Sequence, residues 1–202
     1  TLFRFMTNVY GAAMSLQCTS VSSEQPLAAE LLRAVSRVGP TQLEHVGAHS
    51  SLVRDLAVRL GRLLSLGTED MERLGRAAIL HDVGKLAVPE ALLAKPGELS
   101  LDERRLVETH SRFGAEICSA LGLGESVASV VGNHHRRFDS QQSETELKMN
   151  AALLAGIIAV ADSYVAMTSD RPYAAKRSKS EALAELQRER GLQFDPQVVD
   201  TL

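Results

Sequence analysis

Residues 77–85 read Ala77-Ala78-Ile79-Leu80-His81-Asp82-Val83-Gly84-Lys85, an apolar helical turn followed by a histidine–aspartate pair and then a lysine. The pair lies where a predicted helix meets the core. An imidazole beside a carboxylate is a good set of ligands for a divalent metal ion. A histidine on an apolar helix face is, however, more often a hydrogen-bonded core residue, and His-Asp pairs also occur by chance. The rest of the chain decides between these two interpretations.

Helical spacing of apolar residues extends from Leu27 to the end of the chain. It predicts one helix over residues 27–35 that stops near Gly39-Pro40, and a second over residues 43–66. Strand signals are scarce. We therefore predict an all-α fold: a helical bundle over residues 27–202, preceded by a short N-terminal extension or linker over residues 1–26.

Several later helices have recognisable ends. Acidic residues after Thr68 predict the start of a helix that runs into His81. Capping boxes begin at Ser100 and at Ser178, and the first of these helices is predicted to continue through His110 to Ile117. Three further features are Gly191 as a C-cap, Asp195 as an N-cap and Pro196 at the first position of the last helix.

Composition excludes several classes of protein. With 22 Lys and Arg against 25 Asp and Glu in 202 residues, the chain lacks the basic surface expected for duplex nucleic acid. Cys18 and Cys118 stand alone, so neither a disulfide framework nor a thiolate zinc site is predicted. The most apolar run, Ala151 to Ala161, is too short to span a membrane. We expect a cytoplasmic protein; the start at Thr1 leaves room for an upstream sensor domain, and a homodimer stays open.

Ligand-type side chains recur on the apolar sides of five predicted helices, and in a helical bundle those sides meet. Imidazole and carboxylate donors without thiolate suit iron, manganese, zinc or nickel. Seven or eight donors exceed one coordination shell, so two ions are predicted, with Asp82 between them. Adjacent helical residues point about 100° apart, so the last two histidines are expected to serve two ions rather than one. The candidates are His45, His49, His81, Asp82, His110, His134, His135 and Asp162.

Two ions a few ångströms apart favour in-line displacement at phosphorus. Lys85 lies three residues after Asp82, about one helical turn, and is predicted to stabilise a phosphate oxygen or the leaving group. The alternative is an ordinary surface lysine.

The order His49, His81-Asp82, Asp162 resembles the HD superfamily of metal-dependent phosphohydrolases, and the similarity extends from about Leu43 to the C-terminus. Within it the chain is similar to the HD-GYP subgroup, whose bacterial members hydrolyse cyclic di-GMP. The segments that carry this likeness are His81 to Pro89, Lys95 to Leu99, Thr109 to Gly114, His134-His135, Ala161 to Tyr164, Ala166 to Tyr173, and Gly191 with Phe194 to Pro196.

The resemblance implies a metal-dependent phosphodiesterase that converts cyclic di-GMP, a small cyclic dinucleotide, to linear pGpG and onward to GMP. It implies two divalent ions, most often iron or manganese, with zinc, nickel or magnesium as alternatives. His45 stands where some relatives have a glutamate that recruits a third ion, and its smaller charge leaves a third ion open. The resemblance assigns the metal ligands His49, His81, Asp82, His110, His134, His135 and Asp162, the catalytic residues Lys85 and Asp82, and substrate contacts at Arg171 and Lys85.

Departures from the subgroup affect the substrate side. The Gly-Tyr-Pro that follows the two histidines in relatives is absent, and Ser143 stands where its tyrosine would fall. Basic positions are replaced by Ala174 and Gly156. Arg136 and its neighbour Arg137 are either new phosphate contacts or merely solvated loop arginines, which are the more common case. Two alternatives therefore stay open: a catalytically weak or inactive cyclic-dinucleotide-binding or regulatory module, and an HD phosphohydrolase acting on another nucleotide or phosphate ester.

Overall fold

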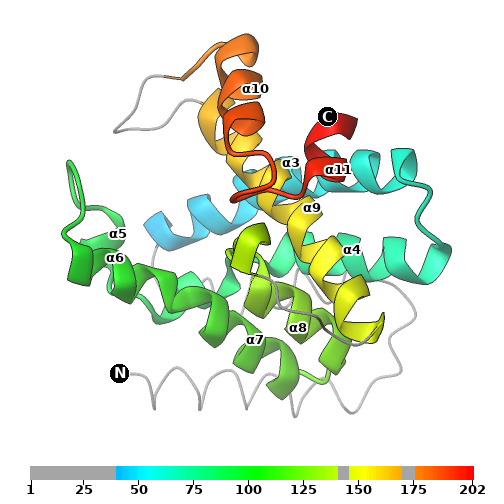
Figure 1. The fold of residues 1–202 in the computed structure, drawn as a ribbon. Coiled ribbons are helices and arrows are strands. Elements are labelled where there is room, and N and C mark those ends of the chain that lie inside the picture. The colour runs from blue at the N-terminus through cyan, green and yellow to red at the C-terminus, as the bar shows by residue number, and fades with distance from the viewer. Residues whose placement is uncertain (1–39, 141–145, 170–175) are drawn as a thin grey trace.

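Helices make up most of the part of the chain that the structure describes. The computed structural model covers residues 40–140, 146–169 and 176–202, with side chains from residue 47 and, in α9, from residue 150 (Figure 1). Within these ranges β pairing is limited to an isolated bridge between Arg190 and Phe194. The helices are α3 (Pro40–Leu63), α4 (Thr68–Leu80), η1 (Val83–Ala87), α5 (Glu90–Leu93), α6 (Leu101–Glu108), α7 (His110–Ala120), α8 (Glu125–Asn133), η2 (Phe138–Ser140), α9 (Glu146–Thr168), α10 (Lys179–Arg188) and α11 (Pro196–Thr201). The prediction of an all-α fold is confirmed.

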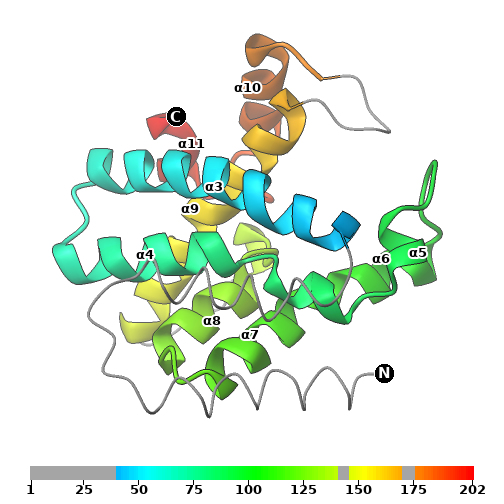
Figure 2. The same ribbon diagram turned by 180° about the vertical axis from the view of Figure 1, so that it is seen from behind.

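Two helical hairpins and one long helix form the bundle. α3 packs against α4, and α7 packs against α8, each pair joined by a short turn (Figure 2). α9 crosses the molecule and contacts both hairpins, and α10 and α11 pack on α9 (Figure 1). The ends of several helices therefore meet near the middle of α9.

α9 is the core helix. Leu154, Ile157, Ile158 and Val160 are at most 1% exposed, which accounts for the apolar character of this segment. By length and composition alone, the helical segment Asn150–Thr168 would be able to cross a membrane. It is longer than the apolar run Ala151 to Ala161 on which the sequence analysis relied. Its packing against α3, α4, α8 and α10 instead makes it the centre of the bundle.

Most predicted helix ends are confirmed. Capping boxes are present at Ser100 with Glu103 and at Ser178 with Glu181, because in each the serine side chain and the glutamate side chain satisfy each other's backbone N–H. Asp195 caps α11 through its bond from the backbone N–H of Gln197.

Three boundaries differ from the prediction. The second helix spans Pro40–Leu63 rather than residues 43–66, and Ser65 follows it with φ 58°. The helix predicted from Ser100 to Ile117 is interrupted at Thr109, which separates α6 from α7. α10 ends with Glu189 as its C-cap, and Gly191 lies in the turn beyond, with φ 77° and its N–H bonded to the Phe194 carbonyl. The 1–26 extension, the 27–35 helix and Cys18 lie outside the described residues.

Candidate metal centre

Three histidines lie next to the C-terminal ends of helices, one of them as the first residue of the next helix, and point inward. His81 follows α4 directly, His134 follows α8 directly, and His110 comes two residues after the end of α6. Each Nδ1 lies 2.7–2.8 Å from the carbonyl oxygen three residues earlier, which belongs to Ala78, Val131 and Val107 respectively. A carbonyl oxygen only accepts, so Nδ1 must carry the proton.

This arrangement serves the helices and the centre together. The last carbonyls of a helix have no partner within the helix, and here the imidazoles satisfy one at each of three helix ends. With the proton on Nδ1, the Nε2 lone pair of each ring is free and directed into the centre. The C-termini of α4 and α8 carry partial negative charge and favour a cation beside His81 and His134, whereas His110 is itself the first residue of α7.

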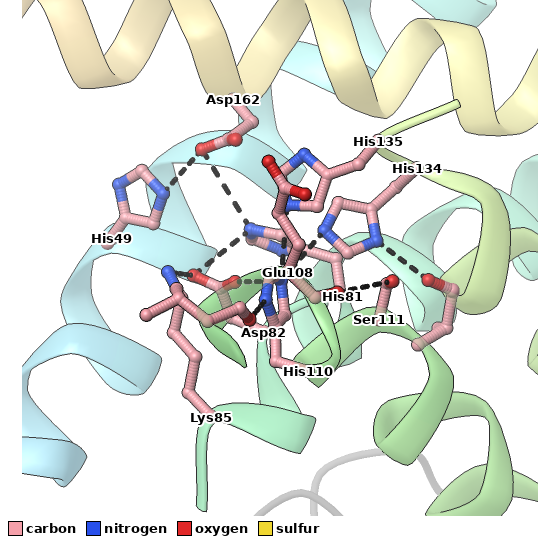
Figure 3. A network of polar contacts seen from close by, with 12 residues as sticks. His49, His81, Asp82, Lys85, Glu108, His110, Ser111, His134, His135 and Asp162 are labelled. Carbon is pink, nitrogen blue, oxygen red and sulfur yellow. Dashed lines mark hydrogen bonds and ion pairs between the residues drawn. The ribbon is translucent and has the colours of Figure 1, made fainter. Parts of the chain in front are cut away.

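The first group of donor atoms consists of His110, His134 and His135, whose ligand atoms lie within 4.8 Å of one another. The Nε2 of His110 lies 3.3 Å from the Nε2 of His134 and 3.2 Å from the Nε2 of His135 (Figure 3). In a neutral His110 or His134 the Nε2 atom is an acceptor, so the contact between these two rings lacks a proton. A cation between the nitrogens would satisfy them all.

The second group consists of His49, His81 and Asp82, again within 4.8 Å. Asp162, from the C-terminal third of α9, extends this group: its Oδ1 lies 2.8 Å from the Nε2 of His49 and 3.9 Å from the Nε2 of His81 (Figure 3). The four side chains come from α3, the end of α4 and α9.

Asp82 connects the two groups. Its Oδ1 lies 3.2 Å from the Nε2 of His110, whereas its Oδ2 lies 3.5 Å from the Nε2 of His81. One carboxylate therefore presents one oxygen to each group, and its side chain is only 3% exposed. This is the geometry expected for a carboxylate shared by two ions.

Gly84 allows this proximity. A Cβ at Gly84 would lie 1.8 Å from the carbonyl oxygen of His110 and 2.5 Å from the nitrogen of Gly114, and both are backbone atoms. η1 thus packs backbone to backbone against the start of α7. That contact holds Asp82 beside His110.

The electrostatics keep both carboxylates charged. Burial raises the pKa of Asp82, but its neighbours His81, Lys85 and His110 outweigh burial and hold that pKa well below its ordinary value. For Asp162 burial again raises the pKa, and the hydrogen bond from His49 and the neighbouring His81 leave it lowered overall. Ionised carboxylates in such a buried place need cationic partners.

The histidine pair, in contrast, stays neutral. Loss of hydration lowers the pKa of His134 well below its ordinary value and that of His135 to about 4, with further lowering by neighbouring histidines. Neutral imidazole is the form that binds a metal.

Lys85 contacts the centre through Asp82. Its Nζ lies 2.6 Å from Asp82 Oδ2 (Figure 3). Asp82 is the N-cap residue of η1, and in a 3₁₀ helix side chains three residues apart eclipse one another. Lys85 is therefore more than a solvated surface lysine.

The donor set fits divalent metal ions. The Nε2 of His81 is buried and has no hydrogen-bond partner within the described residues. Such an orphaned acceptor is costly unless something binds it. Together with the close nitrogen–nitrogen contacts, it indicates that a cation completes the centre.

The structure brings together His49, His81, Asp82, Lys85, His110, His134, His135 and Asp162 out of the predicted site residues. His45 lies in α3, but its side chain is not among those described; Arg171 and Ser143 lie outside the described residues. Arg136 follows His135 at the turn to η2, where its N–H donates to the Asn133 carbonyl.

Two details differ from the sequence analysis. His134 and His135 both group with His110, and their ring centroids lie 4.0 Å apart, so the two side chains face the same group of donor atoms. Arg137, considered as a phosphate contact, makes a two-pronged ion pair with Asp139 at 2.9–3.0 Å.

Sequence reasoning missed the backbone parts of the centre. The three carbonyls that fix the histidine rings leave no side-chain signal. In the sequence, Gly84 is visible only as part of the segment His81 to Pro89. Its position two residues after Asp82 does not predict the backbone contact with α7.

Comparison with known proteins identifies the relatives of this chain. A family model described as HD domain matches residues 34–198. The chain is 39% identical over 145 residues to the cyclic di-GMP phosphodiesterase response regulator RpfG of Xanthomonas campestris, covering 69% of this chain and 38% of that protein. It is 38% identical over 160 residues to the cyclic di-GMP phosphodiesterase PA4108 of Pseudomonas aeruginosa, covering 78% and 38%.

A solved structure has a similar fold. The crystal structure of a cyclic GMP-AMP-specific phosphodiesterase of Vibrio cholerae, V-cGAP3, matches with a TM-score of 0.54 and 29% identity, over 86% of this chain and 38% of that one. The chain thus spans 38% of the length of each of these three relatives.

Proposed function

The chain belongs to the HD domain family, and on this basis we propose that it is a metal-dependent phosphodiesterase that hydrolyses cyclic di-GMP to linear pGpG. The names of the two bacterial relatives that are 38–39% identical support this substrate. The observation that carries the proposal is the carboxylate of Asp82, with one oxygen beside each of two groups of imidazole nitrogens.

We propose that one ion is held by His49, His81, Asp82 and Asp162, and the other by Asp82 and the remaining three histidines. Nitrogen and oxygen donors without thiolate favour iron or manganese, and also accommodate zinc, nickel or magnesium. When bound, the ions would supply Lewis acidity to the phosphate and would lower the pKa of a bound water.

The exposed fractions of the side chains indicate where the substrate enters. His81, Asp82 and His110 are at most 3% exposed, whereas His49, Asp162 and Lys85 are 17%, 20% and 26% exposed. His135 is exposed as well. The open side of the centre is therefore bordered by His135 together with these last three residues.

At this open side the chain's own residues act on the phosphodiester. Lys85 offers its ammonium to a non-bridging phosphate oxygen or to the leaving oxygen and offsets the charge that develops in the transition state. Asp82, which is buried and ionised, keeps one oxygen beside each of the two groups of donor atoms. Arg136 and Arg171 stay predicted substrate contacts.

Hydrolysis of defined substrates tests the proposal. Protein loaded with Fe²⁺ or Mn²⁺ under reducing conditions should convert cyclic di-GMP to pGpG faster than it cleaves 3′3′-cGAMP or an aryl phosphodiester. Chromatography of the products measures each rate. Asp82→Asn keeps the shape of the side chain and removes its charge, so activity should fall at least a hundredfold in folded protein. A wild-type protein that binds two ions per chain and leaves cyclic di-GMP intact would be a binding module instead, and preference for 3′3′-cGAMP would reassign the substrate.

Other predictions extend this proposal. A cytoplasmic location, a homodimer, an upstream sensor domain, and a third ion at His45 stay predictions.

A further inference from the structure

The two oxygens of Asp82 have different surroundings. Oδ1 faces the Nε2 of His110 at 3.2 Å, while Oδ2 faces the Nε2 of His81 at 3.5 Å and also receives the ammonium of Lys85 at 2.6 Å. The lysine is therefore bound to the oxygen that belongs to the group containing His49 and His81. The first group, in contrast, makes its close contacts with its own imidazoles and with Oδ1.

An ammonium at this position competes with a metal ion. A divalent ion held by His49, His81 and Asp82 needs Oδ2 as a ligand, and a unit positive charge 2.6 Å from that oxygen repels it. Side chains here are nearly dry, with Asp82 only 3% exposed, so water screens the repulsion weakly. Repulsion between the two cations therefore favours displacement of the ammonium from this oxygen when the ion binds.

The side chain of Lys85 is free to move away from Asp82. Its side chain is 26% exposed and stands on a flexible four-carbon stem. It borders the same open side as His49 and Asp162, where the proposed substrate enters. Release from Asp82 would therefore place the ammonium beside the substrate phosphate.

We propose that Lys85 is a built-in placeholder cation, which occupies Asp82 Oδ2 in the metal-free protein and leaves it when the ion of the His49–His81 group binds. This inference rests on the proposed function, because it assumes the two-ion centre. It makes the two ions unequal. The histidine group around His110 binds first and tightly, and the His49–His81 group binds second and more weakly because its ion displaces a charge.

Metal titration of the full chain tests the inference without any measurement of hydrolysis. Metal-free wild type titrated with Mn²⁺ in a calorimeter should show a tight and a weaker step. Lys85→Met should tighten the weaker step at least tenfold and leave the tight step unchanged. Lys95→Met is the matched control, because Lys95 pairs at 2.6 Å with Glu103, away from the centre, and should alter neither step.

A second variant guards against misfolding. Lys85→Gln keeps a hydrogen-bond donor and removes the charge, so it should also tighten the weaker step, with circular dichroism confirming the helical content. An unchanged or weakened second step in both variants would overturn the inference while leaving the two-ion centre intact. Absence of any bound Mn²⁺ in wild type would overturn the centre itself, and with it this inference.

Discussion

Gly84→Ala should disable the centre by separating two backbones. The new methyl group would lie 1.8 Å from the His110 carbonyl oxygen, where ordinary contacts begin at about 3.4 Å, and neither partner is a flexible side chain. η1 and α7 must therefore move apart by about 1.5 Å. The 3.2 Å distance between Asp82 Oδ1 and His110 Nε2 would then exceed 4 Å, so Asp82 would no longer serve both groups.

The expected effects are large and measurable. Overpacking of this kind costs about 1–3 kcal/mol of unfolding free energy, and a misplacement of about 1 Å at a reacting centre costs roughly a hundredfold in rate. Urea denaturation and cyclic di-GMP hydrolysis measure the two effects. Gly47→Ala is the control: a Cβ there has no atom within 4 Å, and alanine within α3 should leave stability equal or higher. If Gly84→Ala were as stable and as active as Gly47→Ala, the assigned contact between η1 and α7 would be wrong.

Three further predictions follow from pKa values and capping. His134 and His135 stay neutral in the folded metal-free protein but take up protons below about pH 6.5 when the chain is unfolded. The free energy of unfolding should therefore decrease as the pH falls from about 6.5 to 4. Urea denaturation curves that coincide across this range would contradict the prediction. Burial raises the pKa of the Cys118 thiol to about 12. In a Cys18→Ser variant, an aromatic disulfide reagent should therefore react with Cys118 only after urea is added. Rapid reaction of the native protein would show that this thiol is accessible. Ser100→Ala removes the capping box of α6 and should lower stability by about 1 kcal/mol, measured by thermal denaturation; an unchanged midpoint would mean that this helix end does not limit stability.

Much of the fold could be predicted from the sequence because the signals are local. The capping boxes at Ser100 and Ser178 and the cap at Asp195 each depend on residues within one helical turn, and all three are present. The break at Thr109 was missed because its backbone angles stay near helical values and no glycine or proline marks it. Apolar spacing therefore continues across the interruption.

The candidate metal centre could also be predicted only in part. Imidazoles and carboxylates on the inner faces of helices can be recognised by residue type, so their convergence was predicted correctly. Which rings share a group depends on the ends of helices: His135 lies just past the cap of α8 and turns toward His110. The pairing of Lys85 with Asp82 depends on η1 being a 3₁₀ helix, where sequence spacing suggested only an ordinary turn.

The turn between α10 and α11 binds the segment that follows the histidine pair. The backbone N–H groups of Phe138 and Asp139, just beyond the histidine pair, donate to the carbonyls of Gln193 and Leu192. Leu192 and Gln193 lie 30 and 31 residues after Asp162, the last proposed metal ligand in the chain. The segment that follows the histidine pair can therefore form these backbone hydrogen bonds only after the chain has been synthesised past every proposed ligand.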